Sequence, residues 1–458
     1  MSDQDPAAVR RHLDRLAADG IDVVRVTYPD LIGTDRARDV LVEELPRALE
    51  HGLAFCRAVY HTSPQGDVVP VSGGLDAGLP DVCVRPDLST LVALPWEPGV
   101  AACLADVTDP ATGAPAAESP RDLLRSVLER CREHGLSPVV GPELEYFLCE
   151  PDPAGGWRRY GSVPGVVYTA GLRADPDNHL LRTLRHARDL RIGVLSGNHE
   201  FDGGQFEINL LHSEALSAAD RAFRFKASVK ELARREGRLA TFMAKPFNDT
   251  GGSGFHLHLS CTEGTDGTDG TDAEGRNSFD DPSGAYGLSA TARHAIAGVL
   301  AHAPALAALL NPTVNSYKRF GPDTLAPWLI DWGLDNRSAM VRVPPERGAG
   351  ARLELRLGDA SANPYLAIAA ATAAALLGVM AAEEPPAPLE GYGYDTTKAA
   401  LLPTDLSAAL DALESDTALA ELLGKDFTDS YLSYKRNEVE RFQRYVTDWE
   451  FTEYAYHL

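Results

Sequence analysis

The sequence predicts an α+β protein with two domains, and three observations indicate this class. Residues 6–18 have the spacing of an amphipathic helix, and short strands such as 23–28 and 100–106 follow them. Four later segments alternate polar and apolar residues in strand fashion. A chain of 458 residues with 44% hydrophobic content is long enough to bury two cores.

The boundary between the domains is predicted in a stretch rich in proline, glycine and alanine, residues 109–117. We therefore expect an N-terminal domain at residues 1–112 and a larger domain at residues 113–458. Ser119 and Pro120 begin a helix in the larger domain, because proline is favoured in the first helical turn. The Gly-Thr-Asp repeat at 264–272 is expected to be a flexible insertion rather than a calcium site.

Two carboxylates one residue apart are the most informative feature of the larger domain. Glu143 and Glu145 lie in the largely apolar segment 138–148, which is typical of a buried strand. Side chains at positions i and i+2 of a strand share a face, so both acids are expected to enter one space. Two buried carboxylates need a cation between them, so the pair predicts a metal site. The alternative is a solvated edge strand with an acidic face.

Three further segments carry acids and histidines. Glu200 and Glu207 flank a glycine-rich turn, so two short strands can deliver one carboxylate each. His256 and His258 share one face of an alternating segment, and Glu354 lies between two leucines in another. Oxygen ligands with a single imidazole suit Mg²⁺ or Mn²⁺ better than zinc. Each segment alone is an ordinary half-exposed strand, but four in one chain indicate a shared charged cavity.

Arginines supply the opposite charge. The set comprises Arg319, Arg337, Arg342, Arg352 and Arg356. Guanidinium groups pair with phosphate and carboxylate oxygens and stay charged at any working pH. Carboxylates and metals on one wall with arginines on the other are typical of phosphoryl transfer. For any single arginine, a surface network of ion pairs is the simpler alternative.

These segments resemble the signature blocks of bacterial glutamine synthetases, in the family's order and at nearly its spacing. The matching blocks are 143–145, 199–207, 245–256, 311–319, 352–356, 363–366 and 427–458. The resemblance implies a small N-terminal β-grasp-like domain and a catalytic domain whose curved antiparallel sheet carries the ligands. It also implies ATP as co-substrate and two or three Mg²⁺ or Mn²⁺ ions per site. The implied assembly is a homododecamer of two stacked six-membered rings, with active sites between neighbouring subunits.

The resemblance also implies two metal sites. The metal that bridges the ATP phosphates would be held by Glu143, His256 and Glu354. The metal nearer the acceptor carboxylate would be held by Glu145, Glu200 and Glu207.

The same resemblance implies roles for the remaining matched residues. Arg319 would hold the α-carboxylate of the amino acid, Arg356 its side-chain carboxylate, and Arg337 the transferred phosphoryl group. The residues around the nucleotide would be His258, Ser260, Arg342 and Arg352. Tyr168 and Asp30 would form the amine pocket, with Asp30 coming from a neighbouring subunit.

Together these roles imply a two-step ligation. ATP first converts a carboxylate into an acyl phosphate, because a carboxylate is itself a poor electrophile. Metals and arginines neutralise the charge that develops as the phosphoryl group moves. An amine, deprotonated by Asp30 or Glu200, then attacks the acyl phosphate and forms an amide.

Two positions depart from the family pattern, and both lie on the substrate side of the cavity. Leu325 stands where true glutamine synthetases carry an acid on a flap, unless Asp323 substitutes for it. Gly251, followed by Gly252, stands where the family has an asparagine that contacts glutamate. A leucine favours an alkyl group over a small hydrated cation. We therefore expect glutamate to be joined to an organic amine, as in the γ-glutamylpolyamine and γ-glutamylethanolamide synthetases of this family.

Three alternatives stay open. Glutamine synthesis from ammonia would require only that the flap change is tolerated, and a small-molecule phosphotransferase would stop after phosphoryl transfer. A non-catalytic homologue would keep the assembly without turnover, but the six metal-binding positions are intact. The sequence identifies neither the amine nor, with certainty, glutamate as the acid.

Composition restricts partners and location. The net charge of −23 and the pI near 4.9 argue against nucleic acid and anionic membranes. No signal peptide is visible, and the apolar run 367–379 is too short to span a bilayer, so we expect a cytoplasmic protein. The resemblance implies a role in nitrogen metabolism and amine use. The six cysteines lack paired spacing and are expected to be reduced. Tyr394 falls near a tyrosine that some relatives modify with a nucleotide, but the flanking prolines and acids are missing.

Overall fold

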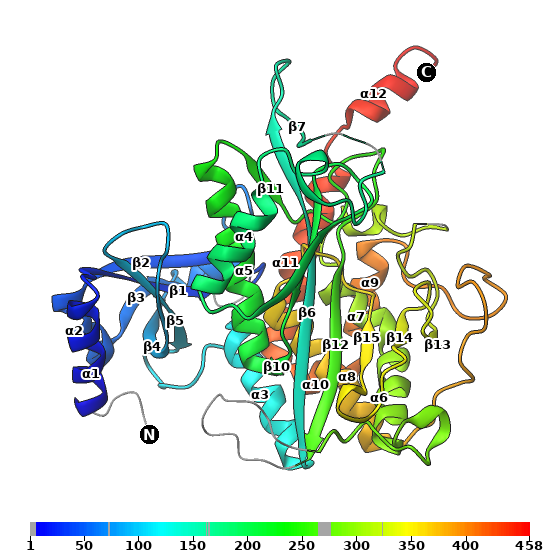
Figure 1. Cartoon of the computed structure of the whole chain (residues 1–458), viewed down its shortest axis with the longest axis horizontal. Helices are drawn as coiled ribbons and strands as arrows, with labels where there is room; N and C mark the ends of the chain where they lie inside the picture. The colour runs from blue at the N-terminus through cyan, green and yellow to red at the C-terminus, as the bar shows by residue number, and fades with distance from the viewer. Residues whose placement is uncertain (1–5, 72–73, 162, 164, 264–275, 323) are drawn as a thin grey trace.

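The chain forms a small sheet near the N-terminus and a larger part built on a curled sheet covered by helices (Figure 1). The computed structural model describes residues 6–71, 74–161, 163, 165–263, 276–322 and 324–458. The α+β class predicted from the sequence is confirmed. Asp323 and the repeat at 264–272 lie outside the described residues.

Five strands form the N-terminal sheet, in the order β2-β1-β5-β4-β3. Neighbouring strands are antiparallel, except that β1 and β5 are parallel. The strands are β1 (Val23–Pro29), β2 (Asp35–Leu41), β3 (Leu53–Cys56), β4 (Asp81–Ala93) and β5 (Val100–Thr108). Helices α1 (Pro6–Ala18) and α2 (Leu45–His51) accompany the sheet, which has a core cluster of its own. The helix predicted at 6–18 is confirmed, whereas the boundary predicted after residue 112 stays a prediction.

The larger sheet has ten strands, of which seven follow the order β13-β14-β15-β12-β6-β9-β8. Its longest strand, β6 (Leu136–Pro151), also pairs with three short strands, β7 (Trp157–Arg159), β10 (Ser213–Glu214) and β11 (Leu239–Thr241). The other strands are β8 (Val194–His199), β9 (Gln205–Leu210), β12 (Phe255–Glu263), β13 (Trp332–Leu334), β14 (Val341–Val343) and β15 (Leu353–Leu355). All neighbours are antiparallel except β13 and β14.

The two faces of this sheet differ in chemistry. In β6, Leu144, Tyr146 and Leu148 enter the main hydrophobic core, so the alternate residues Glu143 and Glu145 point to the opposite face. The same alternation holds in four further strands, whose core residues include Phe206 and Ile208 in β9, Phe255, Leu257 and Leu259 in β12, Val341 and Val343 in β14, and Leu353 and Leu355 in β15. One face is therefore apolar, and the other carries the charged side chains.

Helices pack on the apolar face and around it. They are α3 (Pro120–Glu133), α4 (His179–Asp189), α5 (Ala215–Arg235), α6 (Ala290–Ala301), α7 (Ala303–Leu310), α8 (Pro364–Ala381), α9 (Leu406–Ser415), α10 (Thr417–Leu423) and α11 (Lys425–Gln443). The helix predicted from Ser119 and Pro120 is confirmed, with Ser119 as its N-cap.

Helix α8 is the central helix of the core. It packs against α3, α5 and α6. With 18 residues it is longer than the predicted apolar run, and its length and composition would suffice to cross a membrane. However, 72% of it is buried inside the protein, as expected for a core helix. The sequence predicted a run too short to cross a membrane, whereas the full helix is long enough. Its apolar composition follows from its burial in the core.

A buried arginine joins the two parts of the chain. Arg121 in α3 is 2% exposed and forms ion pairs with Asp87 in β4, Asp106 in β5 and Asp220 in α5. The distances to Asp87 and Asp220 are 2.8 and 2.9 Å. Asp220 also accepts a hydrogen bond from the hydroxyl of Tyr365 in α8, at 2.6 Å. One guanidinium group thus connects the N-terminal sheet to two helices of the larger part.

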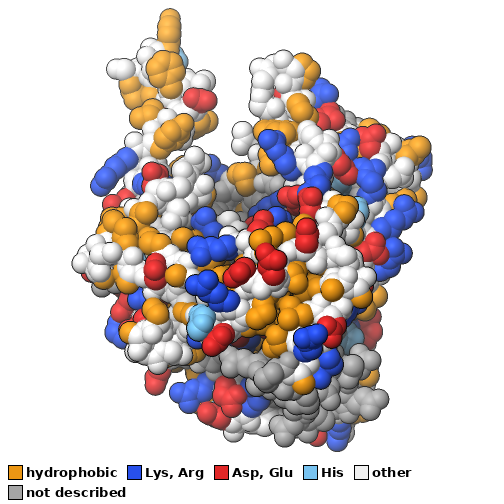
Figure 2. All heavy atoms as spheres, turned by 90° about the vertical axis from the view of Figure 1, so that its left-hand side faces the viewer, with side chains coloured by type: hydrophobic (Ala, Val, Ile, Leu, Met, Phe, Trp, Pro, Cys, Tyr) orange, Lys and Arg blue, Asp and Glu red, His pale blue; other side chains and the backbone are white. Residues whose placement is uncertain are grey.

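The C-terminal helix α12 (Asp448–Tyr454) projects away from the body of the protein (Figure 1). Figure 2 shows it at the top left as a projection on which hydrophobic side chains gather. Trp449 is 63% exposed, Phe451 69% and Tyr456 90%. A single copy of the chain therefore leaves a group of large apolar side chains in water.

We predict that Arg121→Ala lowers the stability of the protein by about 3–5 kcal/mol, because it takes the buried cation from Asp220 and leaves Asp87 and Asp106 with Arg125 alone. Thermal unfolding followed by circular dichroism measures the effect. The control is Arg132→Ala, which removes an exposed ion pair with Glu129 and should change stability by less than about 1 kcal/mol. Equal melting temperatures for Arg121→Ala and the unmodified protein would contradict the structural role of Arg121.

Candidate active site

The functional side chains lie in rows across the charged face of the large sheet, because the strand register sets them opposite one another. In one row Arg342 pairs with Glu354, which pairs with His258. In the next row His256 is opposite Glu143, which is opposite Asn209. In the third row Glu145 is opposite Glu207, which is opposite Asn198. Glu200 directly follows the end of β8. Six predicted metal ligands thus come from neighbouring positions.

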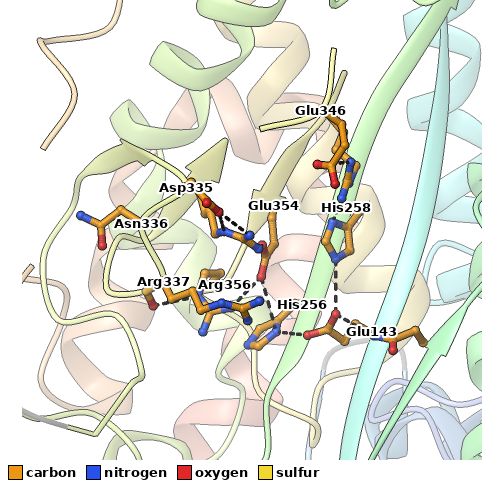
Figure 3. A network of polar contacts seen from close by, with 12 residues as sticks. Glu143, His256, His258, Asp335, Asn336, Arg337, Glu346, Glu354 and Arg356 are labelled. Atoms are coloured by element: carbon orange, nitrogen blue, oxygen red, sulfur yellow. Dashed lines mark hydrogen bonds and ion pairs between the residues drawn. The ribbon is translucent and has the colours of Figure 1, made fainter. Parts of the chain in front are cut away.

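The first cluster contains Glu143, His256 and Glu354, whose ligand atoms lie within 4.8 Å of one another (Figure 3). His256 Nδ1 is 2.6 Å from Glu143 Oε1 and 3.8 Å from Glu354 Oε1. The other ring nitrogen of His256 is buried and has no hydrogen-bond partner among the residues that the structure describes. A histidine held between two carboxylate oxygens fits the predicted metal site.

Cationic neighbours keep the acids of this cluster ionised. Burial opposes ionisation of Glu354, but Arg356, 2.6 Å away, lowers its pKa to about 2. Arg342 lies 2.5 Å from the other oxygen of Glu354. Burial likewise opposes ionisation of Glu143, and hydrogen bonds from His256 and His258 lower its pKa well below the usual value. This half of the site is therefore largely neutralised by the protein itself.

The second cluster contains Glu145, Glu200 and Glu207, and its acids have the opposite behaviour. Burial and the charge of Glu145 raise the pKa of Glu200 to about 7. Burial and the charges of Glu143 and Glu145 raise the pKa of Glu207 to about 9. Within the described part of the chain, no lysine or arginine forms an ion pair with these three acids. Crowded oxygen donors that lack a cation fit a hard divalent ion such as Mg²⁺ or Mn²⁺.

Two amide side chains that received no role from the sequence hold these acids in place. Gln205 donates to Glu145 Oε2 at 3.1 Å, and the backbone amide of Gly254 donates to the same oxygen at 2.9 Å. Asn209 donates to Glu143 Oε2 at 2.7 Å and lies 3.4 Å from Glu207 Oε1. Gln205, Glu207 and Asn209 share one strand face at a spacing of two. That spacing is the signal by which sequence reasoning could have found both amides.

The residues predicted around the nucleotide form one edge of the site. Arg352 Nε is 3.2 Å from His258 Nδ1, and Arg342 pairs with Glu354 and Asp335. Ser260 lies two positions beyond His258 on the same strand and donates to Asn277. These contacts place the nucleotide set beside the first cluster, where phosphate oxygens would meet both arginines.

Arg319 lies on the opposite edge, under a glycine loop. It is 5% exposed, and within the described residues its guanidinium group forms one long hydrogen bond, of 3.4 Å, to the carbonyl of Leu357. A Cβ at Gly252 would lie 2.5 Å from Arg319 Cγ, and a Cβ at Gly254 would lie 3.1 Å from Arg319 Nη2. At Gly252 the arginine and the carbonyl of Ala244, 2.6 Å away, leave no room for a Cβ, and at Gly254 the nearest atom is His256 Nε2 at 2.7 Å. A buried guanidinium with so few acceptors suits a carboxylate ligand.

The predicted amine side is bordered by two residues with strained backbones. Tyr168 has φ = 54° and Leu325 has φ = 59°, a region that non-glycine residues rarely adopt. The backbone amide of Tyr168 donates to the carbonyl of His199, next to Glu200, at 3.0 Å. The carbonyl of Leu325 lies 3.5 Å from Arg356 Nη2. The structure therefore brings both residues to the acids and arginines of the site.

Two further predicted residues border this side. Arg356 Nε donates to the backbone carbonyl of Arg337, whose own side chain is exposed. Tyr394 donates to the carbonyl of Ala326 at 2.9 Å, so its hydroxyl anchors the flap that carries Leu325.

Asp30 is expected to act in the site of a neighbouring subunit, and within one copy of the chain it lies in its own turn. The residue is 1% exposed, and Oδ1 accepts hydrogen bonds from the backbone amides of Ile32 and Thr34. Oδ2 pairs with Arg36 at 2.8 Å. These contacts stabilise the turn, and the role of Asp30 in a neighbouring site stays a prediction.

Comparisons with known proteins agree with this geometry. Residues 117–454 match the family model of the glutamine synthetase catalytic domain. The glutamine synthetase of Methanocaldococcus jannaschii is 35% identical over 97% of this chain and 98% of its own length. That of Pyrococcus horikoshii is 36% identical over 95% of this chain and 96% of its own length. A solved structure described as a GmaS complex with ADP has a TM-score of 0.84 and 33% identity, covering 97% of this chain and 99% of that chain.

We predict that the metal-free protein loses stability as the pH rises from about 5 to about 9. Folding raises the pKa values of Glu200 and Glu207, so the folded state holds protons that the unfolded state has released in this range. The melting temperature should fall with rising pH, and saturating Mg²⁺ or Mn²⁺ should restore it.

Glu207→Gln should remove most of this fall, because it removes the acid with the highest pKa. The control is Glu133→Gln, a change on the exposed side of α3, which should leave the pH profile unchanged. An unchanged pH profile in Glu207→Gln would contradict the assignment of the second cluster.

Proposed function

Since the chain belongs to the glutamine synthetase family, we propose that it is an ATP-dependent ligase that joins the γ-carboxylate of glutamate to an organic amine. The observation that carries the choice of amine is Leu325, an apolar side chain on the flap beside Arg356. An acid at this point would attract ammonium, whereas a leucine offers an alkyl group a surface without water.

The comparisons support two versions of this proposal. The GmaS structures, named for γ-glutamylmethylamide synthetase, match 97–98% of this chain and favour an organic amine. The archaeal relatives named glutamine synthetase favour ammonia, which is therefore the alternative. The two versions share the same activation of the acid and differ in the second substrate.

Activation of the acid would use the two clusters and the arginines. Glu143, His256 and Glu354 would hold one divalent cation, and Glu145, Glu200 and Glu207 would hold another. These ions would neutralise charge on the ATP phosphates and on the acceptor carboxylate. Arg342, Arg352 and His258 would bind the nucleotide phosphates, while Arg319 would fix the α-carboxylate of glutamate. Arg337 and Arg356 would stabilise the charge that develops on the transferred phosphoryl group.

The amine would enter between Tyr168 and Leu325. Glu200 lies next to His199, to which the backbone of Tyr168 is bonded, so a carboxylate is available at this point to take the proton of an alkylammonium ion. The amine nitrogen then attacks the acyl phosphate, the bond to phosphate breaks, and an amide remains. Glu200 is the candidate for the proton acceptor within this chain, and Asp30 of a neighbouring copy is the other candidate.

We predict that the protein with ATP, Mg²⁺, glutamate and a panel of amines releases phosphate fastest with a small alkylamine. The panel should contain ammonium, methylamine, ethylamine, ethanolamine and putrescine, and mass spectrometry of the products identifies the γ-glutamyl amide. Ammonium as the best acceptor by a wide margin would favour the alternative. Phosphate release without any amide would instead indicate a phosphotransferase.

Leu325→Glu tests the flap directly. We expect the ratio of kcat/KM for ammonium to kcat/KM for the best alkylamine to rise by roughly tenfold or more, because a carboxylate binds ammonium by charge. The matched control is Leu41→Glu, an exposed leucine on β2 of the N-terminal sheet, which should leave the ratio unchanged.

We also propose that copies of the chain associate, as the resemblance implies. The apolar side chains on and around α12 support this proposal, because so many exposed aromatic residues mark a surface that another molecule covers. A second copy of the chain is the proposed partner. Truncation after Arg444 should reduce the molecular mass measured by light scattering and leave the melting temperature within a few degrees. An unchanged mass would contradict the role of this segment.

A further inference from the structure

Asp202 is a carboxylate at the substrate edge that has no assigned role. It lies in the turn between β8 and β9, two residues after Glu200. Its Oδ2 accepts a hydrogen bond from the backbone amide of Gly251 at 2.6 Å. Gly251 is the position where the sequence departs from the family, because the asparagine that contacts glutamate is missing there.

The space left by the missing side chain faces Asp202. A Cβ at Gly251 would lie 3.2 Å from Asp202 Oδ2, and no other heavy atom of the described residues would lie within 4 Å apart from chain neighbours. The open volume beside Gly251 therefore ends at a carboxylate. In this chain a charged oxygen at position 202 borders the space that an amide would fill in the family.

Asp202 retains an oxygen for a ligand. Its nearest cation is Arg159, whose Nη1 is 3.7 Å from Asp202 Oδ1. Arg159 instead makes its hydrogen bond to Asp249, at 2.9 Å. Within the described residues, no hydrogen bond to Asp202 Oδ1 is formed, and the side chain of Asp202 is 19% exposed. The carboxylate is thus held by one oxygen and available through the other.

A cation packs against the same loop. Gly252 packs directly on the aliphatic part of the Arg319 side chain, and Gly254 packs on its guanidinium group. Consecutive Cα atoms are about 3.8 Å apart, so the carboxylate at Gly251 and the guanidinium group at Gly254 lie along one loop of four residues. The head of a free amino acid is a zwitterion, with an ammonium and a carboxylate on one carbon. A carboxylate and a guanidinium group along one short loop match those two charges.

We infer that Asp202 binds the α-ammonium group of the amino-acid substrate and replaces the side chain absent at Gly251. This inference rests on the proposed function, in which Arg319 binds the α-carboxylate of glutamate. Asp202 makes the enzyme select an acid that carries an α-amino group. It takes no part in phosphoryl transfer or in deprotonation of the amine, so its loss affects recognition of the acid.

The test compares glutamate with glutarate, which has the same two carboxylates and no amino group. Asp202→Asn keeps an oxygen that can accept the hydrogen bond from Gly251 but removes the negative charge. We expect kcat/KM for glutamate to fall by roughly tenfold or more, mostly through KM, because a hydrogen bond between charged groups is lost. The value for glutarate should change by less than about twofold. If glutarate turns over too slowly, its inhibition constant against glutamate serves the same comparison.

Asp249→Asn is the matched control. Asp249 lies in the same loop and pairs with the same Arg159, but it is exposed and does not contact Gly251. The kinetic constants of the Asp249→Asn variant for glutamate and glutarate should match those of the unmodified enzyme.

The outcomes distinguish failure of the inference about Asp202 from failure of the proposed function. Glutamate kinetics unchanged in Asp202→Asn would overturn the inference and leave the proposed function intact. An equal fall for glutamate and glutarate would also overturn it, because that pattern indicates only support of the loop. An unmodified enzyme that makes no amide from glutamate with ammonium or any amine would refute the proposed function, and the inference with it.

Discussion

The structure depends on one large sheet with an apolar face, which must be buried, and a charged face, which must be neutralised. Leu144, Tyr146 and their counterparts in neighbouring strands are removed from water by helices, and this burial stabilises the fold. The period of two places every intervening residue on the other face, where four carboxylates crowd beside Glu354. Repulsion among them is relieved on one side by Arg342, Arg356 and His256, and on the other side by the raised pKa values of Glu200 and Glu207 or by an added cation. Stability and catalysis are therefore coupled through the same strands.

The division of charge between the two clusters suits a ligase. The first cluster already contains arginines and a histidine, so it can receive the phosphates of a nucleotide without further neutralisation. The second cluster holds acids with raised pKa values, and it lies beside the edge where Arg319 and Asp202 meet the glycine loop. In the proposed function, phosphate chemistry and acceptor recognition would thus occupy adjacent ends of the charged face. Gln205 and Asn209 fix the spacing between those ends.

Backbone geometry contributes as much as side-chain identity on the substrate side. Gly252 lies against Arg319 and Gly254 lies against His256, and Tyr168 and Leu325 adopt left-handed conformations at the edge of the site. Such conformations cost of order 1–3 kcal/mol each and persist where the surrounding structure holds them. Here two hydrogen bonds hold them. The backbone amide of Tyr168 donates to the carbonyl of His199, and the hydroxyl of Tyr394 donates to the carbonyl of Ala326, next to Leu325. The amine side is therefore a pre-shaped surface rather than an open loop.

The sequence by itself determined the fold class, the faces of the strands and the family, because alternation at a period of two is a local property and the motif blocks keep their order. It also identified Glu143, Glu145, Glu200, Glu207, His256 and Glu354 as members of one constellation. Only the tertiary structure decided which strands are neighbours, and therefore that Glu354 is opposite His258 and that Asp202 meets Gly251. It also showed that Asp30 is held by contacts of its own turn and that α8 owes its apolar composition to burial. Register, enclosure and close approach depend on contacts between distant segments, which a pattern along the chain does not contain.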